Sequence, residues 1–248
     1  ICAAEELELS VQFPESVDRI IIDLGDGDEG VGDDLRTYLG QTDVVLHIDN
    51  HAITHRSDLF SHIGFARECV AMGIGKWKKN PVFEAPAFTS DPIPFKFAVK
   101  DTSLMPRYCS CIITADGLGE TPDWMKRRLE ATGWRSINLP IDITNYVMME
   151  VGLPLHSFDA DDIKGTVVMR PAKQGEKIVT LDQSERELSN GALILADDVG
   201  IFDLLGIMGG LRSSTKESTR HFYLHGASLD PVSVRQAMIN MGHRTDAG

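Results

Sequence analysis

Residues 221–241 read HFYLHGASLDPVSVRQAMINM, which places a strand pattern directly before a helix pattern. The apolar character of His221–Leu224 predicts a β-strand. Asp230 is a typical N-cap residue, and Pro231 suits the first helical position because the N–H that proline lacks would have no partner there. The apolar side chains that follow have helical spacing: Val234, Met238 and Met241. The stretch therefore predicts a strand that leads into an amphipathic helix.

The same mixture of strands and helices extends back along the chain. Thr121 is a predicted N-cap, with Pro122 at the first position of its helix. Interspersed strands and helices predict an α+β fold built on a mixed sheet. Four further segments predict strands: Phe95–Val99, Tyr108–Thr114, Thr166–Arg170 and Ala192–Ala196.

A small helical and β-containing region is predicted before this domain. Arg19–Leu24 and Val44–Ile48 are strand candidates over residues 1–50. The acidic loop between them contains Asp26 and Asp28 but lacks the complete ligand series of a calcium loop, so a solvated loop is expected.

A short helical segment is expected over residues 51–80. Ser57 is its predicted N-cap, and Gly73 or Gly75 its predicted end. The prolines within 81–94 exclude a helix, so these residues are expected to link the segment to a domain over 95–248. The apolar stripe of the helix is Leu59, Ile63, Ala66 and Val70.

The charge of the chain is unevenly distributed. The 248 residues include 37 acidic and 24 basic side chains, a net charge of −13. Residues 1–50 hold 13 acidic and 2 basic side chains, a net charge of −11, and residues 51–248 hold 24 and 22, a net charge of −2. The acidity argues against a broad phosphate-binding surface, but it belongs to the first fifth of the chain.

Neither a membrane span nor a secretory signal is predicted from the sequence. Ile1 is not an initiator methionine, and we expect the chain to be an internal fragment of a longer protein. Four cysteines without a disulfide pattern fit a reducing cytoplasm, and Cys109 and Cys111 are expected in the core on one strand face. His51 and His55 have helical ligand spacing but no acidic partner, so no metal site is expected.

Common catalytic motifs are absent from the sequence, including the phosphate-binding glycine loop and the nucleophile elbow. Several polar residues nevertheless interrupt apolar segments. Asp142 reads most simply as a helix N-cap, His156 as a buried core histidine, and Gly206–Gly210 as a turn. Tyr223–Ser228 and Gly242–Gly248 are further candidate segments.

Taken together, these segments resemble the beta subunit of bacterial phenylalanyl-tRNA synthetase over essentially the full chain. No single match is specific, but their order makes chance implausible. The matching segments are Thr54–Leu59, Gly64–Glu68, Pro106–Tyr108, Pro122–Leu129, Asp142–Met148, Gly152–Asp159, Gly175–Glu176, Thr180–Asp182, Gly206–Gly210, Asp230–Arg235 and Arg244–Ala247.

The resemblance implies a tRNA-editing domain over residues 95–248 that hydrolyses the ester of tyrosine wrongly attached to tRNA(Phe). Residues 1–50 would then be the tail of an oligonucleotide-binding-fold insertion with connecting strands. The implied partners are the alpha subunit in an α2β2 heterotetramer, tRNA(Phe) and tyrosine. ATP and Mg²⁺ would serve the whole synthetase, with no cofactor in this fragment. The aminoacylation site would lie in the alpha subunit.

Editing has a physical reason in this family. Tyrosine is phenylalanine with one added hydroxyl, and an apolar pocket rejects an added hydroxyl only about 100-fold. A second site can instead bind that hydroxyl with a polar partner. Phenylalanine would leave this partner unpaired, at a cost of about 1–3 kcal/mol.

The resemblance assigns catalytic roles to three positions. His156 would position the attacking water or hold the terminal ribose. Gly209 would let the substrate approach backbone N–H groups that could also stabilise a developing oxyanion, and its neighbour Gly210 would belong to the substrate-binding residues. Thr245 would complete the wall of the catalytic pocket. No residue has the setting of an activated nucleophile, so direct attack by water is expected.

Other positions are implied to bind the substrate. Arg135 would contact a tRNA phosphate or the terminal nucleotide. Thr144 and Asn145 would line the amino-acid pocket. Ala247 would stay small to admit the tyrosyl ring.

The chain departs from the family at His225, where a glutamate usually accepts the tyrosine hydroxyl. A neutral imidazole offers one donor and one acceptor but lacks the carboxylate charge, and charge-assisted hydrogen bonds are roughly twice as strong as neutral ones. Tyrosine discrimination is therefore expected to be weakened or altered. A second departure is Gly248, where the family often has serine. The alternatives are a tRNA-positioning region with decayed editing and, less favoured, a metal-dependent hydrolase using the early histidines.

Overall fold

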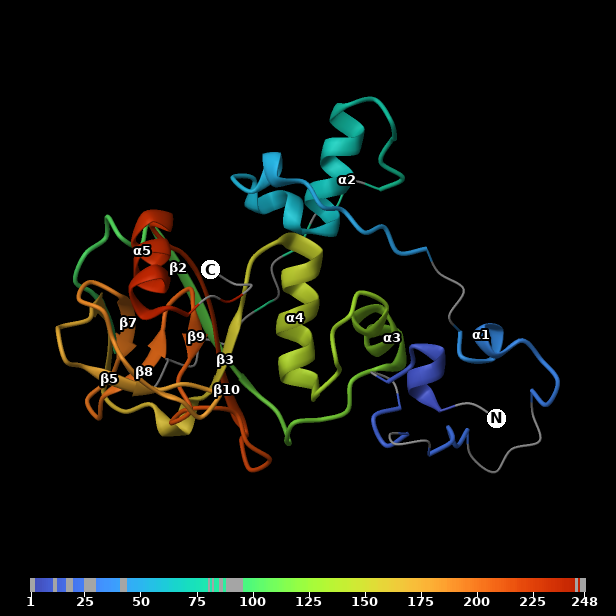
Figure 1. Ribbon diagram of the computed structural model, residues 1–248. Coiled ribbons are helices and arrows are strands. Elements are labelled where there is room, and N and C mark those ends of the chain that lie inside the picture. The colour runs from blue at the N-terminus through green and yellow to red at the C-terminus, as the bar shows by residue number, and fades with distance from the viewer. Residues whose placement is uncertain are drawn as a thin grey trace. The chain divides into compact units, whose positions relative to one another are not determined.

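The computed structural model describes residues 3–10, 13–16, 20–24, 30–40, 44–79, 81, 83–84, 87, 96–243 and 245 (Figure 1). The chain divides into two compact units. Unit 1 comprises Ile1–His55 and Glu120–Asp142, and unit 2 comprises Arg56–Gly119 and Ile143–Gly248. Across the described ranges, none of the helices combines the length and apolar character that crossing a membrane requires.

The regular elements that the structure describes in unit 1 are helices, apart from one isolated bridge. The helical elements are the 3₁₀ helices η1 (Ala4–Leu7) and η2 (His51–Ile53), the helices α1 (Leu35–Tyr38) and α3 (Asp123–Ala131), and the start of α4 (Leu139–Val151). The predicted strands Arg19–Leu24 and Val44–Ile48 are wrong for the residues that the structure describes. Ile21 forms only an isolated bridge with Ala3, and residues 44–48 form no strand and are exposed. An apolar run does not become a strand without a neighbouring strand to complete its hydrogen bonds.

The predicted caps of α3 and α4 are displaced. Pro122 stands at the N-cap position of α3, and the Thr121 hydroxyl donates instead to Asp142. Asp142 does not cap α4, because Asn138 accepts from the Ile141 N–H there. Asp142 lies buried in the first turn, where it also accepts from the Ile137 N–H at 2.9 Å and from the Ser136 hydroxyl.

The helical segment of unit 2 begins later than predicted. Ser57 opens the 3₁₀ helix η3 (Ser57–Phe60), and Ser61 caps α2 (His62–Ala71) by accepting from the Gly64 N–H. The predicted end is confirmed at Gly73, whose φ of +74° provides the left-handed turn after the helix.

Two larger sheets form most of the rest of unit 2. The three-stranded antiparallel sheet has the order β2 (Arg107–Thr114), β10 (His221–Ser228), β3 (His156–Asp159). The five-stranded sheet has the order β1 (Lys96–Val99), β4 (Thr166–Pro171), β7 (Leu193–Ala196), β8 (Ile201–Leu204), β9 (Met208–Gly209), and only β1 and β4 pair in parallel.

Smaller elements complete the unit. The strands β5 (Lys177–Val179) and β6 (Glu185–Glu187) form a hairpin, and η4 (Ala160–Asp162) follows β3. The helix α5 (Pro231–Met241) begins as predicted, because Asp230 accepts from the Ser233 N–H and Pro231 occupies the first turn. Together these elements confirm the predicted α+β fold with a mixed sheet.

Two apolar clusters hold these layers together. The first joins the sheets through Phe158 and Tyr223 on one side and Met169, Leu195 and Phe202 on the other. The second packs α5 against the other face of the five-stranded sheet, as Figure 1 shows. Any side chain that points from the three-stranded sheet towards the first cluster therefore lies between the sheets.

The prediction that Cys109 and Cys111 are core residues is wrong. Cys109 is exposed and Cys111 is only half-buried. Because side chains alternate along a strand, the core receives the other face of β2, which carries Tyr108 and Ile112. Both cysteines are free thiols.

Candidate functional site

The pairing of β3 with β10 places two of the predicted site residues opposite each other. His156 and His225 are register partners across this antiparallel pair, and their ring centroids lie 6.1 Å apart. His225 follows Tyr223 by two residues and therefore points to the same face, towards the other sheet. The side chain of His225 is 6% exposed.

Gly209, on β9 of the opposite sheet, lies directly against His156. A Cβ atom built on Gly209 would lie 2.0 Å from the Nε2 atom of His156 and 2.3 Å from its Cε1 atom. No side chain could occupy this space while the imidazole stays in place. The absence of a side chain at Gly209 is thus what allows the His156 ring to approach β9.

Gly210 is also required by close packing. Its N–H donates to the Phe202 carbonyl at 2.9 Å, and a Cβ on Gly210 would lie 2.5 Å from that oxygen. The N–H of Gly210 is therefore engaged in the sheet rather than directed at a ligand. The carbonyl of Gly209 accepts from the Leu181 N–H at 3.1 Å.

A buried carboxylate that was not a sequence candidate faces His225. The Oδ2 atom of Asp203, on β8, lies 3.3 Å from the Nε2 atom of His225, and the side chain of Asp203 is 4% exposed. Neither ring nitrogen of His225 makes a well-aligned hydrogen bond within the described part of the chain. The signal in the sequence was a lone Asp in the apolar run Ile201–Leu205.

Aromatic rings enclose His225 from both flanking strands. Phe158 on β3 stacks on it with centroids 5.6 Å apart and planes 2° apart, and Tyr108 on β2 stacks at 5.4 Å and 19°. Tyr223 lies at 6.0 Å, and its hydroxyl shares a hydrogen bond with that of Tyr108. Burial raises the pKa of Tyr108 and of Tyr223, with a contribution from the Asp203 charge, so both phenols stay neutral.

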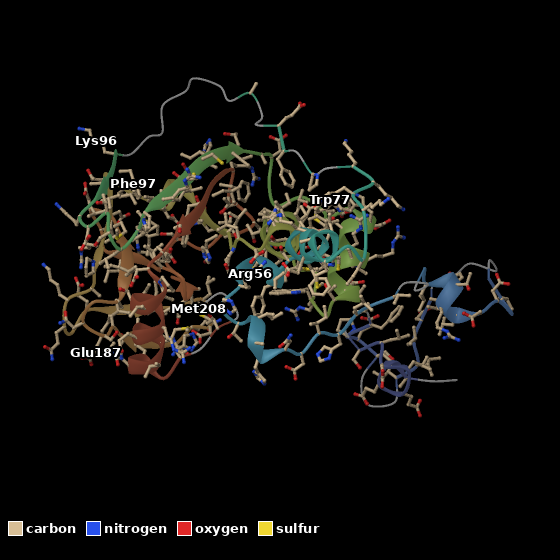
Figure 2. All side chains as sticks on the ribbon, turned by 90° about the horizontal axis from the view of Figure 1, so that it is seen from above. Arg56, Trp77, Lys96, Phe97, Glu187 and Met208 are labelled. Atoms are coloured by element: carbon tan, nitrogen blue, oxygen red, sulfur yellow. The ribbon has the colours of Figure 1, made fainter. Side chains whose placement is uncertain are left out.

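The aromatic stack extends to the edge of the five-stranded sheet. Phe97 on β1 stacks on Tyr108 with centroids 4.3 Å apart. Figure 2 shows Lys96 and Phe97 at the start of this edge strand, with the Lys96 side chain pointing away from the unit. In the same view, Met208 marks the start of β9, the strand at the opposite edge of this sheet.

The protein environment keeps His156 neutral. Burial lowers the pKa of His156, Asp203 opposes this shift and the neighbouring His225 adds to it, and the net result is a pKa of about 4. An imidazole with this pKa is uncharged at neutral pH, so one of its ring nitrogens is free to accept a hydrogen bond.

This shift predicts a loss of stability in acid. The pKa of His156 is lowered from 6.5 to about 4 on folding, so between these pH values the unfolded chain binds a proton at His156 that the folded chain does not bind. The contribution of neutral His156 to the free energy of unfolding is complete above pH 6.5 and is lost as the pH falls towards 4. Between pH 6.5 and 4.5 the free energy of unfolding should fall by about 2 kcal/mol from this residue alone.

Urea unfolding at these two pH values measures the effect. His156→Gln should remove about 2 kcal/mol of the pH dependence, and the exposed His62→Gln, in the same unit, should leave it unchanged. Equal pH dependence in wild type and His156→Gln would contradict the assignment.

The structure locates the other predicted site residues separately. Thr245 donates to the Ile207 carbonyl at 2.9 Å and so lies near β9. Thr144 is buried and Asn145 half-buried on α4. Arg135 is exposed and belongs to unit 1. Ala247 lies outside the described residues.

No metal centre is found in the part of the chain that the structure describes. No group of three His, Cys, Asp or Glu side chains there could hold a metal ion. The side chain of His51 is 97% exposed, and the Nδ1 atom of His62 lies 3.0 Å from the Met149 carbonyl oxygen. The acidic pair Asp26 and Asp28 lies outside the described residues.

Comparison with known families places this cluster within a recognised domain. The model of the B3/4 domain matches residues 104–248, which include His156, Asp203, Gly209 and His225. The chain belongs to the B3/4 domain family. Both sheets, apart from the edge strand β1, thus lie within the B3/4 region.

Curated relatives of this B3/4 protein are phenylalanine–tRNA ligase beta subunits. That of Syntrophus aciditrophicus is 39% identical over 220 residues, covering 88% of this chain and 27% of the relative. That of Geobacter sulfurreducens is 37% identical over 250 residues, covering 100% and 30%. The chain therefore spans less than a third of the length of these relatives and is homologous to part of their beta subunit.

A solved structure is similar at a lower level. An N-terminal fragment of the phenylalanyl-tRNA synthetase beta subunit from Pyrococcus horikoshii is 18% identical, with a TM-score of 0.44, over 76% of this chain and 59% of that chain.

Proposed function

We propose that the site between the two sheets hydrolyses the ester of tyrosine attached to tRNA(Phe), as part of a phenylalanine–tRNA ligase beta subunit. The observation that carries this proposal is the pairing of a neutral His156, held against Gly209, with a buried polar group at His225. The first can position water, and the second can recognise a hydroxyl. The names of the curated relatives point to a tRNA as the substrate, and the tyrosyl ester follows from the resemblance of the sequence motifs.

In the proposed reaction, water attacks the ester carbonyl carbon directly. A neutral His156 accepts a hydrogen bond from this water and orients its lone pair towards the carbonyl. The bond between the carbonyl carbon and the ribose oxygen then breaks, and the proton lost by the water ends on that oxygen. A neighbouring hydroxyl of the tRNA can assist the transfer. The balance requires no reactant besides water.

The remaining site residues are proposed to hold the substrate. Thr245, whose hydroxyl donates to the Ile207 carbonyl, completes the wall of the pocket, and Ala247 leaves room for the tyrosyl ring. Thr144 and Asn145 line the amino-acid pocket, and Arg135 contacts a phosphate or the terminal nucleotide of the tRNA. These assignments rest on the resemblance of the sequence motifs.

The wider assembly is also a proposal. The chain would work in the cytoplasm within an α2β2 synthetase, with the alpha subunit and tRNA(Phe) as partners. ATP and Mg²⁺ would act at the aminoacylation site rather than in this region. Tyrosine would be the edited amino acid.

The competing function is tRNA positioning by a domain whose editing has decayed. His225 favours it, because this residue stands where the family has a glutamate. Deacylation of tyrosyl-tRNA(Phe) by the whole synthetase separates the two. We expect hydrolysis well above the uncatalysed rate, with phenylalanyl-tRNA(Phe) largely spared. A rate equal to that of buffer would support the decayed alternative.

A further inference from the structure

Asp203 is the one carboxylate whose contact with His225 the structure defines. It reaches the Nε2 atom at 3.3 Å, and both side chains are more than nine-tenths buried. The charge of Asp203 also contributes to the pKa values of Tyr108, Tyr223 and His156. The charge of Asp203 therefore raises the pKa of each of the three titratable rings that lie around His225.

We propose that Asp203 is a positioning residue that makes the Nδ1 atom of His225 the acceptor for the tyrosine hydroxyl. This inference rests on the proposed editing function and deepens it. In the family, the residue that binds the tyrosine hydroxyl carries the carboxylate itself. Here that residue would be His225, and the carboxylate would belong to Asp203, on β8 of the facing sheet.

The tautomer of His225 follows from this contact. A neutral imidazole carries one N–H and one lone pair, and the hydrogen bond made by one nitrogen decides which it is. A carboxylate attracts an N–H and repels a lone pair, so the 3.3 Å contact with Asp203 favours the proton on Nε2, even though the two groups are not aligned as a hydrogen bond. The lone pair is then on Nδ1.

The Nδ1 atom is suited to a ligand that donates. Like Nε2, it is buried and makes no well-aligned hydrogen bond in the described part of the chain, but the contact with Asp203 is made by Nε2, so Nδ1 is the nitrogen left without a partner. Phe158 and Tyr108 cover the ring from the two flanking strands, which leaves the ring edge for recognition. A phenol hydroxyl can donate to this nitrogen, whereas the phenyl C–H of phenylalanine cannot.

Asp203 also strengthens the acceptor. A carboxylate beside the Nε2–H increases electron density on the imidazole, as the carboxylates next to metal-binding histidines do. The pair thus restores part of the charge assistance that a lone neutral histidine lacks. Tyrosine discrimination would then be retained despite the missing glutamate.

The first test is the tautomer itself, read from ¹⁵N chemical shifts of histidine in the 248-residue chain at neutral pH. We expect Nε2–H at His225 in the wild type and its loss as the dominant form in Asp203→Asn. Asp161→Asn is a matched control, because it makes the same change at the exposed pair of Asp161 with His221, 2.9 Å apart. An Nδ1–H tautomer in the wild type would overturn the proposal.

The second test measures the ratio of tyrosyl-tRNA to phenylalanyl-tRNA hydrolysis by the whole synthetase. Asp203→Asn should lower this ratio about tenfold, the difference between a charge-assisted and a neutral hydrogen bond. With His225→Glu, the new carboxylate binds the hydroxyl directly and is only repelled by Asp203, so Asp203→Asn should not lower the ratio. An equal loss in both backgrounds would show a structural role and overturn the proposal.

A synthetase that does not hydrolyse tyrosyl-tRNA would refute the proposed function but not yet this inference. In that case, the inference about Asp203 is tested by adding tyrosine or phenylalanine to the chain and recording the ¹⁵N signals of His225. A shift caused by tyrosine alone and abolished by Asp203→Asn supports the proposal. The same response to both amino acids, or to neither, overturns it.

Discussion

Replacing Gly209 by alanine is expected to lower the hydrolysis of tyrosyl-tRNA(Phe) by about 100-fold or more. The new Cβ would lie 2.0 Å from the Nε2 atom of His156, a distance that no pair of non-bonded heavy atoms tolerates. The imidazole must therefore move, and a displacement of about 1 Å at a reacting group can cost a factor of about 100 in rate. The rate of tyrosine release by the whole synthetase measures the effect.

The same substitution should destabilise unit 2 by about 1–3 kcal/mol, the usual range for overpacking. Gly75→Ala is the matched control, because nothing lies within 4 Å of a Cβ at Gly75. In a His156→Ala background the clash is absent, so most of the penalty of Gly209→Ala should disappear. A penalty that persists there would show that Gly209 is required for another reason.

Replacing His156 by alanine is the second large effect. We expect deacylation of tyrosyl-tRNA(Phe) to fall about 100-fold to 1,000-fold, within the range for loss of a residue that orients or accepts a proton. The loss should appear mainly in kcat, because the ring acts on the water rather than on the tyrosyl group. Synthesis of phenylalanyl-tRNA should be unchanged, since that site is expected in the alpha subunit.

The exposed His62→Ala, in the same unit, serves as the control for a lost histidine. It should leave deacylation at the wild-type rate. If His156→Ala also hydrolyses tyrosyl-tRNA at the wild-type rate, His156 has no part in catalysis and the site lies elsewhere.

Five of the ten strands that the structure describes in unit 2 could be predicted because their apolar runs are long enough to be specific. These are β1, β2, β4, β7 and β10, which all overlap the predicted segments. Apolarity alone was insufficient near the N-terminus, where residues 44–48 have the composition of a strand but form none. A strand depends on its neighbours, and the sequence of a single segment does not contain them.

Helix starts and strand faces were less predictable for the same reason. Ser57 and Ser61 are equally plausible caps, and the choice depends on which turn packs against the rest of the unit. The face of β2 that becomes core is fixed by the second sheet, so Tyr108 turns inward and Cys109 outward. Local patterns leave this choice open.

The candidate site was foreseen only in part. The motifs singled out His156, Gly209 and His225, and the fold brings these three together. Asp203 could not be recognised as their neighbour, because its contact with His225 depends on how the two sheets pack. The space that Gly209 leaves for His156 likewise exists only once β9 faces β3.

A crystal of this chain soaked with tyrosine tests the central claim most directly. We predict tyrosine bound between the two sheets, with its phenol oxygen within hydrogen-bond distance of the Nδ1 atom of His225 and its carboxyl end beside His156 and Gly209. Phenylalanine should not occupy the same position at equal concentration. Tyrosine bound away from His156, Gly209 and His225, or phenylalanine bound equally well among them, would contradict the account.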